Sequence, residues 1–142
     1  MTKAVSYPGA DSITHKRMAA VRRSGTGPEL TVQKILDGLG AEYRANEPDL
    51  AGTPDFYLIE PGIPIFVHGC FWHRHSGCRK SSVPKTNQEY WGSKFLANIK
   101  RDKRVLRELR YSGFKPLIIW QCETANVPKL TKRIKRRLLR SI

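Results

Sequence analysis

The chain has 142 residues, enough for one domain that buries its core without disulfides, which excludes a multidomain protein. Its 26 lysines and arginines against 12 acidic residues give a net charge of +14, beyond the magnitude of about 2 to 8 that solubility needs, which indicates a polyanionic partner. The sequence shows no long apolar run, no signal peptide and an odd number of cysteines without pair spacing, which predicts a soluble chain in a reducing, intracellular compartment.

The first half of the chain predicts an arm, a helix and a hairpin. Residues 1–23 are expected to form a basic arm with a short helix around residues 14–21, ahead of one domain over residues 24–142. Thr26-Gly27-Pro28-Glu29 is typical of a capping box, and it predicts a helix that Gly40 ends. Residues 42–67 carry short aromatic and β-branched segments, which predict strands joined by a hairpin turn at residues 60–62.

The second half predicts a helix, a strand and a helix. Residues 90–110 place apolar side chains at helical spacing, and Gly113 ends this long helix. The apolar run KPLIIW at residues 115–120 predicts a strand in the middle of the sheet, covered on both faces. Residues 127–140 predict a basic amphipathic helix. The order of these elements predicts a three-layer α-β-α domain with a small mixed sheet.

The segment VHGCFWHRHSGC at residues 67–78 holds three of the four histidines and two of the three cysteines. Structural zinc takes four tetrahedral Cys or His ligands, of which Cys70, His75 and Cys78 supply three. Cys122, just past the predicted strand, completes the set. The alternative is that Cys70 and Cys122 are buried thiols and the histidines are surface residues.

Two histidines of this segment remain available for acid–base chemistry. His68 and His73 carry imidazoles, the usual general acids and bases at neutral pH. The hairpin would bring Asp55 beside Val67, and a carboxylate with a backbone carbonyl suits Mg²⁺. Asp55 and the Val67 carbonyl therefore predict a magnesium site, with the turn chemistry of a Pro-Asp pair as an equal alternative for Asp55.

Other candidate residues have competing explanations. Glu29 stands at a capping position and could serve helix stability alone. Asp102 lies among three basic residues, which favours a surface ion pair on a helix. Phe71 and Trp72 are expected outside the domain centre, where aromatic side chains stack on bases or wedge between them, and Trp91 fits either a wedge or the core.

The motif FVHGCFWHRH at residues 66–75 is specific, and the sequence from residue 14 to residue 122 resembles the very short patch repair (Vsr) endonuclease family. The supporting segments follow in the family's order: MAAV (18–21), TGPE (26–29), GTPDF (52–56), EYW (89–91), NIKRDKR (98–104) and LIIWQC (117–122). The resemblance implies a Mg²⁺-dependent endonuclease on a restriction-endonuclease-like, PD-(D/E)xK-related fold with a structural zinc knuckle. Such enzymes nick the T-containing strand 5′ of a T:G mismatch left by deamination of 5-methylcytosine.

The resemblance also implies roles for individual residues. Asp55 and the Val67 carbonyl bind Mg²⁺, His73 activates water, and His68 and Glu29 assist. The structural zinc ligands are Cys70, His75, Cys78 and Cys122, and the DNA-contacting residues are Met18, Phe71, Trp72 and Trp91.

The sequence departs from the family's pattern at two places. Ser76 and Gly77 separate His75 from Cys78 where family members can have one residue, and Gly77 allows the looser knuckle. Position 67 is Val where Thr also occurs, so the carbonyl is retained without a hydroxyl.

The expected partner is mismatched double-stranded DNA, together with mismatch-repair helper proteins, for a monomer associated with the bacterial nucleoid in the cytoplasm. A zinc-stabilised DNA-binding module without catalysis would have the same charge, but it needs neither Asp55 nor His73. A nuclease cutting unmismatched DNA in restriction or defence is the other alternative. An HNH nuclease is disfavoured, because its histidines belong to a ββα-metal hairpin rather than a cysteine-rich knuckle.

Overall fold

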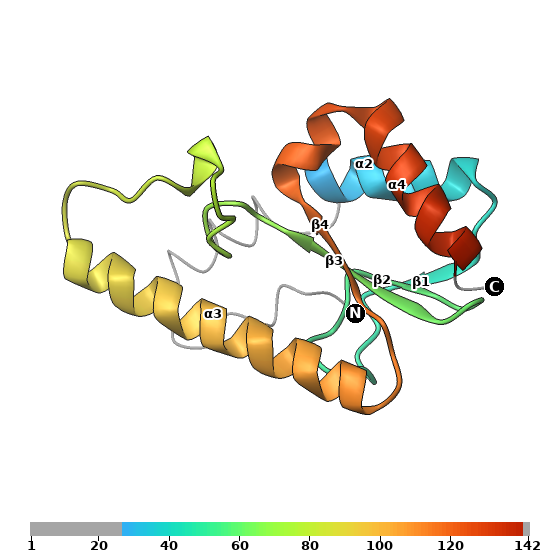
Figure 1. Ribbon diagram of the computed structural model, residues 1–142, viewed down its shortest axis with the longest axis horizontal. Helices are drawn as coiled ribbons and strands as arrows, with labels where there is room; N and C mark the ends of the chain where they lie inside the picture. Colours follow the sequence, from blue (N-terminus) through green and yellow to red (C-terminus); the bar gives the residue numbers. More distant parts are fainter. Residues whose placement is uncertain (1–26, 141–142) are drawn as a thin grey trace.

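Figure 1 shows the computed structural model, which describes residues 27–140. The predicted arm at residues 1–23, its short helix, Met18 and the capping residue Thr26 lie outside the described residues. The elements are α2 (Gly27–Gly38), β1 (Tyr43–Ala45), β2 (Phe56–Leu58), β3 (Ile63–His68), η2 (Arg79–Ser81), α3 (Gln88–Tyr111), β4 (Leu117–Trp120), η3 (Gln121–Ala125) and α4 (Val127–Arg140).

The four described strands form one mixed sheet in the order β1-β2-β3-β4. β2 and β3 pair as the predicted antiparallel hairpin, with Phe56 opposite Ile65. β3 and β4 run parallel, with His68 opposite Trp120. These pairings confirm the small mixed sheet expected from the order of the elements.

The position predicted for residues 115–120 is wrong, because β4 lies at the edge of the described sheet and pairs with β3 alone. The segment is apolar because its two faces are covered: Leu117 and Ile119 are buried, and Ile118 and Trp120 are half-buried. Along the edge, Arg133 of α4 donates to the Ile118 carbonyl at 2.9 Å. Covered faces and a side-chain partner at the edge therefore give this strand the composition of a central one.

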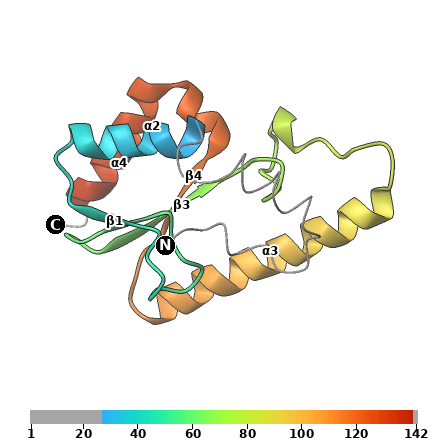
Figure 2. The ribbon, with the colours of Figure 1, turned by 180° about the vertical axis from the view of Figure 1, so that it is seen from behind.

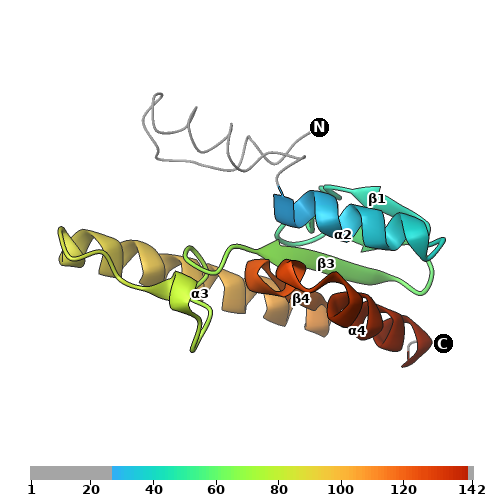
Figure 3. The same ribbon diagram turned by 90° about the horizontal axis from the view of Figure 1, so that it is seen from above.

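Helices lie on both faces of the sheet. α2 and α4 cover one face and α3 runs along the other, as Figures 1 and 2 show from opposite sides. Seen from above in Figure 3, α2 and α4 lie side by side over the strands. The main core between these two helices and the sheet consists of Val32, Ile35, Leu36, Phe56, Leu58, Ile63, Ile65, Val67, Leu117, Ile119, Leu130 and Ile134. Because side chains alternate along a strand, Phe66, His68 and Trp120 lie on the face toward α3.

The long helix α3 has 24 residues and, at 1.5 Å per residue, spans about 36 Å. Its N-terminal half extends past the sheet beside the segment that follows β3 (Figure 1). Phe95 in its N-terminal half and Leu109 near its C-terminal end are buried, and Gly113 follows the helix with a left-handed φ of 94°, as its predicted stop requires. No helix in residues 27–140 is long and apolar enough to cross a bilayer.

The loop before β2 packs against α3 through Gly52. Gly52 has a φ of 75°, and a Cβ built on it would lie 2.5 Å from Val105 Cγ1 and 3.2 Å from Phe66 Cε1. The same loop places Asp55, whose backbone carbonyl accepts from Asn46 at 2.9 Å. Gly52 therefore allows the close approach that holds Asp55 at the start of β2.

We expect Gly52→Ala to lower the free energy of unfolding by about 1–3 kcal/mol, since the new methyl group is overpacked and the backbone is strained. Urea denaturation measures the change. Gly38→Ala is the control, because nothing lies within 4 Å of its added Cβ, and it should leave stability unchanged or slightly raised. Equal losses in the two variants would contradict the packing argument.

Candidate functional site

The candidate site lies where the parallel strands β3 and β4 end. His68 and Trp120 are the last residues of these strands and face each other in register. The chain leaves β3 into residues 69–78 and leaves β4 into η3, which carries Cys122. Two segments about fifty positions apart in sequence are thus brought to one edge of the sheet.

Cys70, His75, Cys78 and Cys122 form a cysteine–histidine cluster whose ligand atoms all lie within 4.8 Å of one another. His75 Nδ1 is 3.6 Å from Cys70 Sγ and 3.4 Å from Cys122 Sγ. A tetrahedral zinc site with bonds of about 2.0–2.3 Å has ligand separations of about 3.3–3.8 Å. The cluster therefore fits a zinc ion in both ligand chemistry and spacing.

The local backbone accommodates the two residues between His75 and Cys78. Cys78 N–H donates to the His75 carbonyl at 3.2 Å, and Gly77 takes a left-handed φ of 74°. Ser81 Oγ lies 2.7 Å from the Cys70 carbonyl and 2.8 Å from the His75 carbonyl, and donates toward both. The longer spacing thus closes into a turn that still directs both side chains into the cluster.

Burial raises the pKa of the Cys70 thiol to about 12, and hydrogen bonds with the Cys122 and Cys78 thiols add to the rise. Cys70 is fully buried, and these three sulfur atoms lie close together. A thiolate is the form that binds zinc, and a divalent cation favours that form strongly. Burial disfavours the thiolate of Cys70 when no cation is present, and a bound divalent cation would compensate its negative charge. The site is therefore suited to a cation.

Four rings connect this cluster to a second group of titratable side chains. The His75 ring stacks on the Trp120 indole with centroids 4.2 Å apart. Trp120 meets His68 edge-on at 5.2 Å, and His68 stacks on His73 at 3.8 Å with an interplanar angle of 7°. Trp120 thus fixes the distance between the candidate zinc ligands and the histidine pair.

His73 Nδ1 lies 2.6 Å from Asp102 Oδ2, and both side chains are largely shielded from solvent. His68, His73 and Asp102 have ligand atoms within 4.8 Å of one another. The expectation of a surface ion pair for Asp102 was therefore wrong. Residues adjacent in sequence point to different faces of a helix, and Asp102 lies on the face of α3 that meets His73.

The hairpin brings Asp55 to Val67, as its strand register predicts. Asp55 is 4% exposed, and its Oδ2 accepts a hydrogen bond from the Val67 N–H at 2.7 Å. Val67 precedes His68, so this carboxylate lies at the same strand end as the histidine pair. Asp55 and the backbone of Val67 offer the oxygen atoms that a hard cation such as Mg²⁺ prefers.

Glu29 lies in the first turn of α2, and it is half-buried. α2 contacts η3, and Figures 1 and 2 place the beginning of α2 beside η3. The first turn of α2, which carries Glu29, thus lies near the end of the sheet that carries the site. The capping role predicted for Glu29 involves a residue that is not described.

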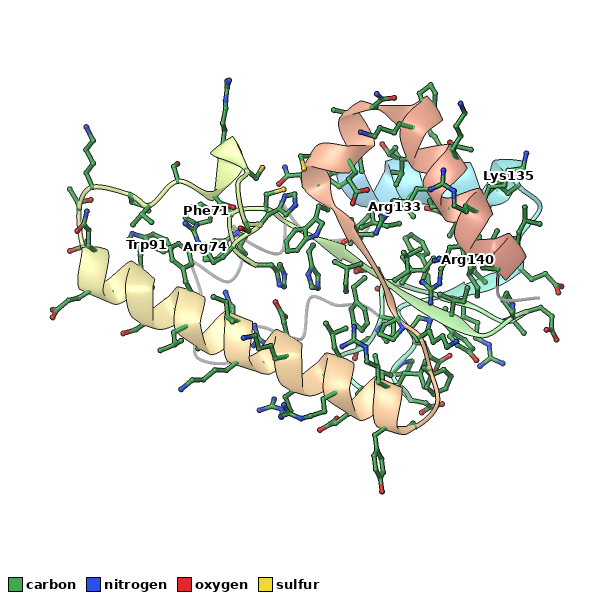
Figure 4. All side chains as sticks on the ribbon, viewed as in Figure 1. Phe71, Arg74, Trp91, Arg133, Lys135 and Arg140 are labelled. Carbon is green, nitrogen blue, oxygen red and sulfur yellow. The ribbon has the colours of Figure 1, made fainter. Side chains whose placement is uncertain are left out.

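An aromatic cluster of Phe71, Trp72, Trp91 and Phe95 lies on the N-terminal half of α3. Phe71 is 5.1 Å from Trp72 and 5.5 Å from Trp91, and Trp91 stacks on Phe95 at 5.8 Å, between ring centroids. The guanidinium of Arg74 lies 3.9 Å from the centroid of Phe95. Figure 4 shows Phe71, Arg74 and Trp91 together, away from the strands. Phe71 and Trp72 thus lie outside the main core, half-buried, as expected.

Comparisons with known proteins show the family of the chain. The family model described as DNA mismatch endonuclease Vsr matches residues 10–80. The chain is 38% identical to the DNA mismatch endonuclease Vsr of Escherichia coli (strain K12), over 82% of this chain and 74% of that protein. It is 39% identical to the type II nicking enzyme V.XorIIP of Xanthomonas oryzae pv. oryzae, over 83% of this chain and 86% of that protein. The chain belongs to the Vsr DNA mismatch endonuclease family.

A solved structure supports the same class of enzyme. The catalytic domain of the homing endonuclease I-Bth0305I is similar with a TM-score of 0.60 and 25% identity, over 83% of this chain and 99% of that one. Vsr-family membership together with this endonuclease neighbour shows that the protein is a DNA endonuclease. The family and fold class expected from the sequence are confirmed.

Asp102 is the residue of the candidate site whose surroundings its sequence neighbours predicted wrongly. It lies within NIKRDKR, one of the segments that carried the resemblance, and this context was the available signal. Asn98 in the same segment donates from Nδ2 to the Trp72 carbonyl at 3.0 Å. Asn98 and Asp102 are four positions apart and occupy one face of α3, a spacing that the sequence of this segment already contains.

We expect Trp120→Leu to shift the imidazole C–H resonances of His75 and His68. Both imidazole rings lie against the indole, and the ring current of the indole displaces these resonances. Loss of two aromatic contacts of about 0.5–1.5 kcal/mol each should lower the free energy of unfolding by about 1–3 kcal/mol. Proton NMR and urea denaturation measure these changes. Trp91→Leu, which removes a ring in contact with other aromatic side chains, should leave the two histidine signals in place. Unshifted signals in the Trp120 variant would refute the ring arrangement.

Proposed function

We propose that this Vsr-family endonuclease nicks one strand of duplex DNA at a T:G mismatch, on the 5′ side of the mismatched thymine. The observation that carries the proposal is the His73–Asp102 pair, stacked on His68 at the strand end where Asp55 is buried. A DNA-binding module without catalysis needs no such arrangement of a carboxylate-bound histidine beside a buried carboxylate. The protein acts as a monomer in the bacterial cytoplasm near the nucleoid, with mismatch-repair helper proteins as further partners.

His73 is the proposed general base. A carboxylate accepts a hydrogen bond, so Asp102 selects the tautomer with the proton on Nδ1 and leaves the Nε2 lone pair to take a proton from water. The stacked His68 ring holds the plane of His73 and supplies a polar group to the scissile phosphate. Glu29 is the further assisting residue, on the basis of its motif.

Asp55 and the Val67 carbonyl are the proposed Mg²⁺ ligands. A bound Mg²⁺ ion would neutralise charge on the phosphate as the bond breaks. The hydrogen bond from Val67 N–H to Asp55 Oδ2 holds the carboxylate at the strand end. Because only backbone atoms of Val67 take part, a valine serves here as well as a threonine.

The aromatic cluster is the proposed wedge. Its partly exposed rings are those of Phe71, Trp72 and Trp91, beside the candidate site. Rings of this kind insert between base steps. Unstacking a mismatched base pair costs less free energy than unstacking a matched one, so insertion of aromatic rings favours binding at a mismatch. Met18, outside the described residues, is the proposed contact from the N-terminal arm.

Relatives named type II nicking enzymes favour a second candidate, a nicking enzyme that acts on unmismatched sites. Duplexes with one T:G mismatch and matched T:A and C:G duplexes of the same flanking sequence, each labelled on one strand and supplied with Mg²⁺, separate the candidates. We expect a nick in the T strand of the mismatched duplex alone. Equal cleavage of matched DNA would replace the proposal with the second candidate, and no cleavage with any divalent ion would leave a binding module.

We expect Asp55→Ala and His73→Ala each to lower the nicking rate by at least about 10²-fold, since a general base alone contributes about 10² to 10⁴. Asp102→Asn, of nearly the same shape, should lower it by at least about 10-fold by loss of the correct tautomer. All three should bind mismatched duplex with near-normal affinity, whereas Trp72→Ala should lose binding and mismatch preference together. Single-turnover nicking measures the rate, and titration with mismatched and matched duplexes measures the affinity and the mismatch preference.

The exposed Glu108 of α3 provides a matched control for these charge changes. Glu108→Gln should nick at the wild-type rate. Wild-type rates in the Asp55 and His73 variants would show that the assignment of the site is wrong.

We further propose one structural zinc ion per chain at the cysteine–histidine cluster. Loss of one of four ligands collapses such a site, so Cys70→Ala or Cys122→Ala should lose folded protein and not activity alone. Because zinc takes the thiolate form and burial raises the pKa of Cys70, zinc affinity should fall as the pH is lowered. Elemental analysis measures the bound zinc at each pH, and circular dichroism measures the folded protein. The exposed Ser76→Ala is the control that keeps zinc. Folded wild-type protein without zinc would end this claim.

A further inference from the structure

Helix α4 concentrates positive charge on the side of the molecule away from the aromatic cluster. It carries seven basic residues and no acidic one: Lys129, Lys132, Arg133, Lys135, Arg136, Arg137 and Arg140. Leu130 and Ile134 are buried against the main core, which forces the basic side chains to the remaining faces of the helix. Figure 4 shows Arg133, Lys135 and Arg140 on α4, at the opposite end of the molecule from Phe71 and Trp91.

Four of these arginines line a groove of about 440 Å³ between α4 and the edge strand β4. The residues of this arginine groove are Leu117, Arg133, Arg136, Arg137 and Arg140, so no carboxylate is among its described lining. Leu117 begins β4, whereas the candidate catalytic site lies at the other end of the strand, on the other face of the sheet. The arginine groove is therefore separate from the catalytic site.

The inner wall of the arginine groove is held in place by hydrogen bonds to the edge strand. Arg133 donates to both carboxylate oxygens of Glu123, at 2.9 and 3.1 Å, and to the Ile118 carbonyl at 2.9 Å. Arg137 donates to the Lys115 carbonyl. Because these side chains occupy one carbonyl of β4 and one just before it, the groove is poorly suited to an added peptide strand.

The outer wall presents Arg136 and Arg140, which have no acidic partner among residues 27–140. Arg136 and Arg140 are exposed, and no described carboxylate forms an ion pair or hydrogen bond with either. They are four positions apart, so their side chains leave the same face of α4. Burial lowers the pKa of Arg137, and the like charges of Arg140 and Arg133 beside it lower it further by repulsion. A polyanion in the groove would relieve that repulsion.

The chemistry of the groove favours phosphate. Guanidinium groups present planar pairs of donors that match phosphate oxygens, and successive phosphates of a duplex would meet the arginines of successive helical turns. We propose that the arginine groove is a second DNA-binding site, which takes the phosphodiester backbone of a duplex segment outside the nicked site and holds the enzyme on unmismatched DNA. This inference rests on the proposed DNA substrate and extends it to a second contact.

The test compares two double variants with the same loss of charge on the same helix. Arg136→Gln with Arg140→Gln changes the groove, and Lys129→Gln with Lys132→Gln changes exposed residues that do not line it. Affinity for a long unmismatched duplex is measured over a range of salt concentrations. The groove variant should bind about 10-fold or more weakly at low salt, and the slope of log affinity against log salt should fall by about 2. The control should stay close to the wild type.

A second measurement separates this inference from the proposed function. Nicking of a short T:G duplex at saturating protein should be unchanged in the groove variant, since the catalytic residues are intact. A wild-type protein that fails to nick T:G while the groove effect persists would refute the proposed function alone. Equal affinity losses in both double variants, or none in either, would overturn the inference, because the charge would then act without a specific site.

Polyglutamate serves as a probe for the competing occupant, an acidic protein. We expect it to bind the wild type weakly and to be unaffected by the groove substitutions. If it binds as tightly as DNA and loses affinity as strongly in the groove variant, then carboxylates fill the groove and the inference is overturned.

Discussion

The parallel pairing of β3 with β4 is the constraint on which the candidate site depends. It sets His68 opposite Trp120, so the loop after β3 and the turn after β4 leave the sheet at the same edge. Only this pairing brings Cys122 to Cys70, and only this register places the Trp120 indole between His75 and His68. A shift by one residue would move Trp120 to the opposite face and separate the candidate zinc ligands from the histidine pair.

Helix α3 fixes the other side of the same site. Asp102 binds His73, Asn98 binds the Trp72 carbonyl, and Phe95 packs on Phe71, so one face of a single helix positions three parts of the loop. A rigid helix fixes the relative positions of the side chains along it, which explains how a loop outside the main core holds the proposed base and the proposed wedge in fixed positions. The proposed catalytic step and the proposed mismatch contact therefore share one support.

The edge strand β4 separates two regions of different chemistry. Its end contributes Trp120 to the site, while its beginning borders the arginine groove. Glu123 links the two, because it accepts from the Trp120 N–H at 2.9 Å and from Arg133 at 2.9 Å. The chain's large positive charge is thus not spread evenly: one part of it forms a groove with fixed inner walls, which differs from the solvated face that helix composition alone suggests.

Local sequence determined what depends on near neighbours: the stops of the helices at Gly40 and Gly113, the β2–β3 hairpin with Asp55 beside Val67, and the spacing that makes Cys70, His75 and Cys78 one turn. These features follow from backbone preferences and short-range register, which a single segment encodes. The tertiary structure alone decided that β4 is an edge strand and that Asp102 faces His73. Both depend on which partner packs against a segment. A covered edge strand has the same apolar pattern as a central strand, and a charged residue on a helix has the same sequence neighbours whichever side chain it contacts.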